Sequence, residues 1–159
     1  MSNLTCPCGS PLYSECCQPL HLGQKKAESA EQLMRSRYSA FATQEIDYIV
    51  KTTALGQQQA LDVNAIAEWS KANTWLKLDV LQAKEKLGKN HAQVEFKAHY
   101  ADANDQAHKE QIHHEVSHFV KHDGAWYFLD PTTDQQITMK QPCICGSAKK
   151  FKQCCAEFL

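Results

Sequence analysis

Eight cysteines, gathered into one short cluster near each end of the chain, constrain the fold more than any other feature. Both clusters follow one pattern, Cys-x-Cys-Gly-Ser and then an adjacent cysteine pair, and no cysteine lies between them. Four thiols so close in sequence are the ligand set of one tetrahedral zinc ion. The pattern therefore predicts two zinc sites. Their ligands are Cys6, Cys8, Cys16 and Cys17 in the first, and Cys143, Cys145, Cys154 and Cys155 in the second.

The predicted role of both metals is structural, because four sulfur ligands complete the tetrahedron and leave no position for water. Disulfides, a thiol redox sensor and an iron–sulfur cluster are the other interpretations of these cysteines. Disulfides are typical of exported proteins, and the first five residues lack the apolar stretch of a signal peptide. Adjacent cysteines with short loops between the pairs fit one metal ion better than an iron–sulfur cluster.

The length and charge of the chain narrow its class. A chain of 159 residues has room for one ordinary domain with small appendages. No stretch is apolar enough for a membrane span, so we expect a cytoplasmic protein without membrane contact, whose thiols stay reduced. The formal net charge of −1 provides no overall basic field to attract nucleic acid.

Between the clusters, the hydrophobic pattern changes from a helical period to an alternating one. Ser29 and Gln32 fit a capping box, which predicts the start of a helix. The predicted helices cover 30–44, 46–52 and 63–72, and the predicted strands cover 75–87, 94–100, 111–122 and 125–129. Helices followed by antiparallel strands indicate an α+β domain, in which a curved antiparallel sheet packs on the helices. We therefore expect a zinc knuckle over 1–22, a central domain over 26–138 and a second knuckle over 141–159.

The second cluster resembles a known motif. The run Cys143–Cys155 is similar to the SEC-C motif, the zinc-binding tail first associated with the SecA translocation ATPase. The first cluster, Cys6–Cys17, is similar as well, but its loop is one residue shorter and contains no lysine. The resemblance implies that the cysteines of the second cluster bind zinc, and it covers the first cluster less closely.

The chain as a whole resembles the YchJ family of bacterial proteins, which carry SEC-C motifs around a central domain. The most specific match is the run Leu33–Phe41, and Glu115–Val120 and Gly124–Tyr127 also match. The resemblance implies a middle domain with the nuclear-transport-factor-2-like cone, in which helices pack into a strongly curved antiparallel sheet. It implies a fold and a metal, but no reaction.

Cone folds of this kind often hold a cavity between the sheet and the helices. Glu115 and Ser117 share one face of the predicted strand 111–122, so we expect them to project into such a cavity and to pair with Arg35 or Arg37. A buried pair of this kind is more often structural than catalytic. The candidate lining residues are Arg35, Arg37, Tyr38, Trp69, His99, Glu115, Ser117 and Trp126.

The predicted function is binding rather than catalysis. The second cluster contains three lysines, Lys149, Lys150 and Lys152. They either balance the charge of the thiolates or form a docking surface for an anionic partner. We expect that partner to be an acidic protein, with RNA as the weaker alternative. By analogy with the SecA tail, we expect an adaptor that acts through its knuckles. The alternative is a small-molecule enzyme or ligand carrier that uses the cavity. The sequence has no phosphate-binding loop, nucleophile elbow or metalloprotease helix, which lowers the expectation of an enzyme.

Overall fold

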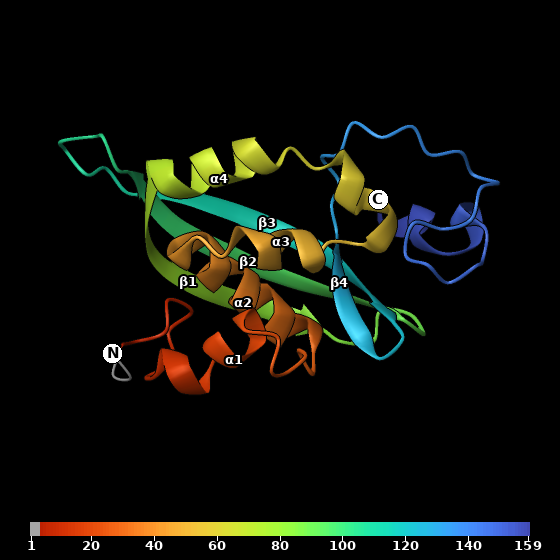
Figure 1. Cartoon of the computed structure of the whole chain (residues 1–159), viewed down its shortest axis with the longest axis horizontal. Helices are drawn as coiled ribbons and strands as arrows, with labels where there is room; N and C mark the ends of the chain where they lie inside the picture. Colours follow the sequence, from red (N-terminus) through yellow and green to blue (C-terminus); the bar gives the residue numbers. More distant parts are fainter. Residues whose placement is uncertain (1–3) are drawn as a thin grey trace.

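One antiparallel sheet of four strands forms the centre of the molecule, and helices lie across one of its faces (Figure 1). The computed structural model describes residues 4–159. Residues 1–3 lie outside that range. They are part of the predicted knuckle 1–22 and of the N-terminal stretch that lacks the pattern of a signal peptide. The strands are β1 (Asn73–Lys84), β2 (His91–Asp102), β3 (Gln111–His122) and β4 (Ala125–Leu129). The helices are η1 (Tyr13–Glu15), α1 (Gln18–His21), α2 (Ala30–Thr43), α3 (Ile46–Lys51), η2 (Leu55–Ala60), α4 (Val63–Ala72), η3 (Phe151–Gln153) and η4 (Cys155–Phe158).

The predicted α+β class is confirmed, since four α-helices precede four strands that pair in sequential order in the described part of the chain. Helix α4 and strands β3 and β4 have the predicted bounds, and α2 ends one residue early. Strand β2 is longer than the predicted 94–100 because its two neighbours pair with it on both sides. Two register shifts in the pairing of β1 with β2 let the sheet bend around the helices.

Helix α2 begins where the sequence predicts, with one difference in its cap. The Ser29 hydroxyl accepts a hydrogen bond from the Gln32 amide at 3.0 Å, as in a capping box. The Gln32 side chain, however, accepts from the amide of Glu28 at 2.6 Å rather than from that of Ser29. The Glu85 carboxylate accepts hydrogen bonds from the first two amides of α2 at 2.8 and 3.0 Å. This carboxylate fastens the start of α2 to the β1–β2 connection.

The apolar core has two parts, and each contains one of the cysteine clusters. In the first part, the N-terminal cluster packs with Leu33 and Met34 of α2 and with Phe119 of β3. In the second part, the C-terminal cluster packs with Ile144, Phe151 and the end of the sheet. The two clusters lie toward opposite ends of the molecule (Figure 1). Among residues 4–159, no helix has both the length and the apolar character needed to cross a bilayer.

The C-terminal segment is seated on η2 through backbone contact. The Gly56 amide donates a hydrogen bond to the Ile144 carbonyl at 2.7 Å. A Cβ atom at Gly56 would lie 2.8 Å from the Ile144 Cα, which is closer than side chains approach. Just before η2, the Ala54 amide donates to the Phe128 carbonyl of β4 at 2.8 Å. The same short segment therefore contacts the C-terminal cluster on one side and the sheet on the other.

Candidate metal centres and central cavity

The N-terminal cluster brings its four sulfur atoms into the arrangement that one metal ion requires. The Sγ atoms of Cys6, Cys8, Cys16 and Cys17 all lie within 4.8 Å of one another. The Cys8–Cys16 and Cys16–Cys17 sulfurs are 3.5 and 3.8 Å apart. A tetrahedron with zinc–sulfur bonds of about 2.3 Å has sulfur–sulfur edges of about 3.8 Å. All four cysteines are free thiols, so the separations reflect a common centre rather than disulfides.

Local backbone geometry aims these sulfurs at one point. Gly9 has a positive φ of 110°, and its amide donates to the Cys6 carbonyl at 2.9 Å, which closes a tight turn around the first pair. The second pair lies between η1 and α1, where Cys16 has a non-helical conformation (φ −121°, ψ −98°). This break in the helical path turns two adjacent side chains toward the same centre.

The C-terminal cluster repeats the arrangement. Its four sulfurs also lie within 4.8 Å of one another, and those of Cys145–Cys154 and Cys154–Cys155 are 3.6 and 3.9 Å apart. Gly146 has a positive φ of 89°, and Cys154 between η3 and η4 has φ −135° and ψ −99°. The two clusters therefore share the same local backbone geometry around their cysteines. Each of the two quartets can hold a metal ion.

The pKa shifts of the cysteine thiols indicate that each quartet favours a bound cation. Hydrogen bonding from Cys155 lowers the pKa of Cys145 to about 4, whereas burial raises the pKa of Cys154 to about 11. In the first quartet, hydrogen bonding from Cys17 lowers the pKa of Cys8, and burial raises that of Cys16 to about 11. A bare quartet thus keeps protons on part of its sulfurs. A divalent cation is the group that replaces those protons and compensates four thiolates.

Two histidines that were not predicted support the clusters, His21, which is half-buried, and His91, which is buried. The His21 Nδ1 lies 2.6 Å from the Tyr13 hydroxyl and its Nε2 lies 2.8 Å from the Ser36 carbonyl, which ties α1 to α2. The His91 Nε2 lies 3.3 Å from the Cys155 Sγ, and its ring stacks on a C-terminal phenylalanine. His91 is far from Cys155 in sequence, so no motif spacing could have indicated this contact.

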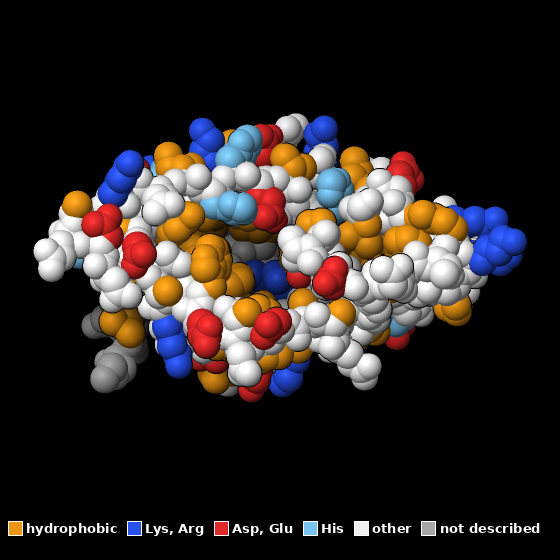
Figure 2. All heavy atoms as spheres, turned by 90° about the horizontal axis from the view of Figure 1, so that it is seen from above, with side chains coloured by type: hydrophobic (Ala, Val, Ile, Leu, Met, Phe, Trp, Pro, Cys, Tyr) orange, Lys and Arg blue, Asp and Glu red, His pale blue; other side chains and the backbone are white. Residues whose placement is uncertain are grey.

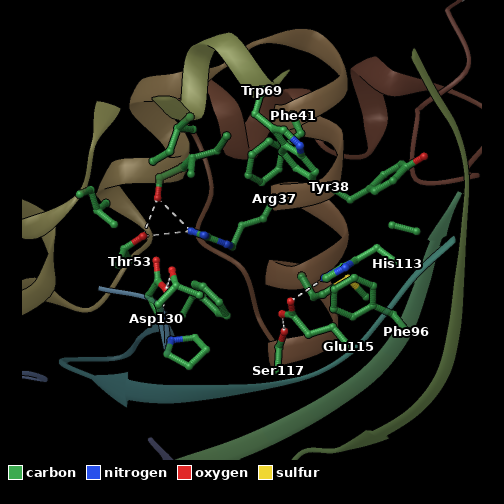
Figure 3. Close-up of a pocket in the computed structure, with 18 of the residues that line it drawn as sticks. Arg37, Tyr38, Phe41, Thr53, Trp69, Phe96, His113, Glu115, Ser117 and Asp130 are labelled. Atoms are coloured by element: carbon green, nitrogen blue, oxygen red, sulfur yellow. Dashed lines mark hydrogen bonds and ion pairs between the residues drawn. The ribbon is translucent and has the colours of Figure 1, made fainter. Parts of the chain in front are cut away.

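The central cavity has a volume of about 420 Å³ and lies between helices α2, α3 and α4 and the covered face of the sheet. Figure 2 shows its mouth as a hollow with a basic side chain at the bottom, and Figure 3 shows the residues around it. Five of the eight candidate residues line it: Arg37, Tyr38, Trp69, Glu115 and Ser117. Further lining residues that we did not predict include Phe41, Phe96, His113, Phe119 and Asp130.

The other three candidates lie elsewhere. Arg35 forms an ion pair with Glu31 at 2.9 Å and donates to the Cys8 carbonyl, so it contacts the N-terminal cluster. His99 lies on the opposite face of β2, where its Nε2 is 2.8 Å from an Asp79 carboxylate oxygen. Trp126 lies beside Lys121 near the tip of the β3–β4 hairpin.

The expected ion pair between Glu115 and an arginine is not formed in the described part of the chain. Glu115 instead contacts the His113 Nε2 at 2.9 Å and accepts a hydrogen bond from the Ser117 hydroxyl. All three residues are on β3 and face the cavity (Figure 3). The correction has a simple cause, since the two oxygens of Glu115 already have partners on its own strand.

Comparison with known proteins agrees with this architecture. Residues 29–131 match the family model described as "YchJ, middle NTF2-like domain", and residues 139–157 match that of the SEC-C motif. A UPF0225 protein from Actinobacillus succinogenes is 44% identical over 155 residues, which cover 97% of each chain. A UPF0225 protein from Haemophilus influenzae strain Rd is 49% identical and covers 97% of this chain and 92% of its own.

Two solved structures are similar over most of the chain. The crystal structure of a SEC-C motif containing protein from Psychrobacter arcticus has a TM-score of 0.89 and 46% identity, and it covers 99% of this chain and 98% of that one. The solution structure of a SEC-C motif containing protein from Rhodopseudomonas palustris has a TM-score of 0.72 and 39% identity. It covers 80% of this chain and 96% of that one.

Proposed function

The chain belongs to the YchJ family, with an NTF2-like middle domain and a SEC-C motif, and from this premise we propose that each cysteine quartet holds one structural zinc ion. The observation that carries the proposal is the spacing of the sulfurs, which are 3.5–3.9 Å apart where they pair most closely. Four thiolates in a tetrahedron select zinc over the harder divalent cations.

The role of the zinc ions is to fasten both ends of the chain to the middle domain. Residues 141–159 contribute few apolar side chains to the core, chiefly Ile144 and Phe151. Metal binding supplies about 10–16 kcal/mol in zinc-finger peptides, which is enough to fold segments of this size. No thiolate is available for a catalytic or redox role, because all four sulfurs of each cluster coordinate the metal.

Metal analysis of the purified chain tests this proposal. We expect about two zinc ions per chain, and about one after the double substitution Cys154→Ser, Cys155→Ser. Replacing Gln106 and Lys109 with serine provides a control, since both are exposed in the turn between β2 and β3 and neither is a proposed ligand. Fewer than one zinc per chain, or iron in its place, would contradict the proposal.

We also propose that the C-terminal cluster docks an acidic protein partner. Lys149, Lys150 and Lys152 are exposed, and none forms an ion pair with a carboxylate in the part of the chain that is described. Figure 2 shows basic side chains at the end of the molecule that the C-terminal segment occupies in Figure 1. Three unpaired cations on a rigid, metal-held turn favour an anionic surface.

Affinity capture from a clarified lysate tests the docking. We expect a partner to be retained by the unmodified chain and lost from a variant with Lys149→Gln, Lys150→Gln and Lys152→Gln. Lys25→Gln with Lys26→Gln is the matched control, because both lysines are exposed but lie far from this cluster. Equal recovery on both variants would refute docking through these lysines, and loss of the captured material on nuclease treatment would indicate RNA instead.

A further inference from the structure

The cavity contains one buried cation among the described residues that line it. Arg37 of α2 is only 9% exposed, and its Nη1 donates to the Ile49 carbonyl at 2.9 Å and to the Thr52 hydroxyl at 2.7 Å. The Thr53 hydroxyl lies 3.4 Å from the same nitrogen. These contacts come from the end of α3 and the two residues after it, so they hold the guanidinium in place at the bottom of the cavity (Figure 3).

No carboxylate among residues 4–159 lies within ion-pair distance of this cation, although the charge of Asp130 acts on it. The two carboxylates of the lining have donors of their own, since Glu115 contacts His113 and Ser117, and Asp130 accepts from the Thr132 amide and hydroxyl at 2.8 and 2.6 Å. Burial lowers the pKa of Arg37 to about 10, which still leaves it charged at neutral pH.

The unused donors of Arg37 point to where an anion would bind. Every hydrogen bond that Arg37 makes within residues 4–159 comes from Nη1. Its Nε and Nη2 groups have no such bond, and neither is among the buried atoms without a partner in residues 4–159, so both stay accessible to an acceptor that enters the cavity. Two neighbouring guanidinium N–H groups match the two oxygens of a carboxylate.

Most of the remaining lining is apolar or aromatic, and the polar side chains in it include His113, Glu115 and Ser117 of β3. Phe41, Trp69, Phe96 and Phe119 contribute to its walls. Phe128 lies against the guanidinium, with 4.4 Å between its ring centroid and the Arg37 Cζ. Trp69 is 44% exposed and packs edge-on against Phe41 at 5.7 Å. A largely apolar cleft of this size with a few polar groups is the usual form of a small-molecule site.

We propose that the cavity binds a small monocarboxylic acid with an apolar, ring-sized body, whose carboxylate pairs with Arg37. A single carboxylate fits better than a phosphate or a dicarboxylate, because Glu115 and Asp130 in the same lining repel a second negative charge. The aromatic walls enclose the body of the ligand, and Trp69 lies at its side. This inference goes beyond the proposed zinc and docking functions, since it concerns neither cluster.

Titration of the zinc-loaded full chain, followed by amide chemical shifts, tests the inference with defined probes. Benzoate, phenylacetate and 2-naphthoate offer one carboxylate on bodies of increasing size. We expect at least one of them to shift the resonances of the cavity residues at millimolar concentration. The matching neutral amide should bind about 10- to 100-fold more weakly, because a charge-assisted hydrogen bond is lost. The corresponding aryl phosphate should also bind more weakly.

Variants of the two arginines of α2 provide the matched comparison. Arg37→Met should weaken binding of the acid by the same factor of about 10–100 and leave binding of the amide unchanged. Arg35→Met, in the same helix but outside the cavity, should bind the acid as the unmodified chain does. Equal binding of acid and amide by the unmodified chain would overturn the inference without any variant. So would the absence of shifts at cavity residues with all three acids, or an Arg37→Met protein that binds the acid unchanged.

Discussion

At the scale of single residues, the two clusters depend on positions that the cysteine pattern does not reveal. Gly56 lets the C-terminal backbone approach η2, and His91 contacts a cysteine sulfur from the first residue of β2. Both residues are far in sequence from the C-terminal cluster that they support. Their contribution therefore becomes visible only when the fold brings distant segments together.

Gly56→Ala should destabilise the protein by about 1–3 kcal/mol, the usual cost of overpacking a tightly packed contact. The added methyl group would lie 2.8 Å from the backbone Cα of Ile144, so the C-terminal segment would have to move. Gly88→Ala is the matched control, because the nearest atom to a Cβ there is 3.9 Å away. Urea unfolding of both variants measures the difference, and equal unfolding free energies would contradict the close contact.

His91→Ala should weaken zinc binding by the C-terminal cluster alone, by about 10- to 100-fold, which is the usual effect of removing a hydrogen-bond partner of a metal ligand. The His91 Nε2 is 3.3 Å from the Cys155 Sγ and is positioned to donate to the thiolate. Competition with a chelator should show one zinc lost early and the other retained. The N-terminal cluster serves as the internal control, and simultaneous loss of both metals would argue against this role.

At the scale of elements, periodicity in the sequence predicted most of the fold but less of the cavity. The bounds of α4, β3 and β4 followed from their patterns, and the alternation in β3 placed Glu115 and Ser117 on one face. The same alternation in β2 places His99 on the face opposite Phe96, so that candidate could have been set aside from the sequence.

The choice between the two arginines of α2 could not be made from sequence. Residues two apart on a helix differ by about 200° in direction, so Arg35 and Arg37 face different surroundings. Which of them meets the cavity depends on how α2 is rotated against the sheet and on where the N-terminal cluster packs. That rotation is a property of the tertiary fold. The pairing of Glu115 with its strand neighbours is likewise a side-chain choice that periodicity does not determine.

Strand β3 also gives the protein a dependence on pH. Burial lowers the pKa of His118 below its ordinary value of 6.5, so the unfolded chain binds this proton more readily than the folded chain does. Stability from this group is therefore complete above pH 6.5 and declines as the pH falls through 6.5 toward the folded pKa. We expect His118→Gln to show a smaller loss of unfolding free energy on acidification than the unmodified chain.

The control for this pH dependence is His108→Asn. His108 is exposed in the turn between β2 and β3 and has a positive φ of 49°, which asparagine tolerates. Urea unfolding at a series of pH values should give the His108→Asn protein the same pH profile as the unmodified chain. A His118→Gln profile that also matches the unmodified chain would show that His118 does not contribute.

At the scale of the whole molecule, two cysteine clusters lie at the ends of a chain whose middle encloses a cavity. The N-terminal cluster contacts α2 through the Arg35 side chain, and the C-terminal cluster contacts η2 through Gly56. Arg37 of α2 in turn bonds to residues just before η2. The N-terminal cluster thus contacts a helix that lines the cavity, and the C-terminal cluster contacts the segment that follows the partners of Arg37.

In the proposed metal sites, four sulfurs surround one zinc ion in each cluster. X-ray absorption at the zinc edge of the purified full chain tests this coordination most directly. We expect a single shell of about four sulfur atoms at about 2.3 Å, without nitrogen or oxygen ligands. A first shell with nitrogen or oxygen ligands, or fully native protein whose cysteines are joined as disulfides and bind no zinc, would contradict it.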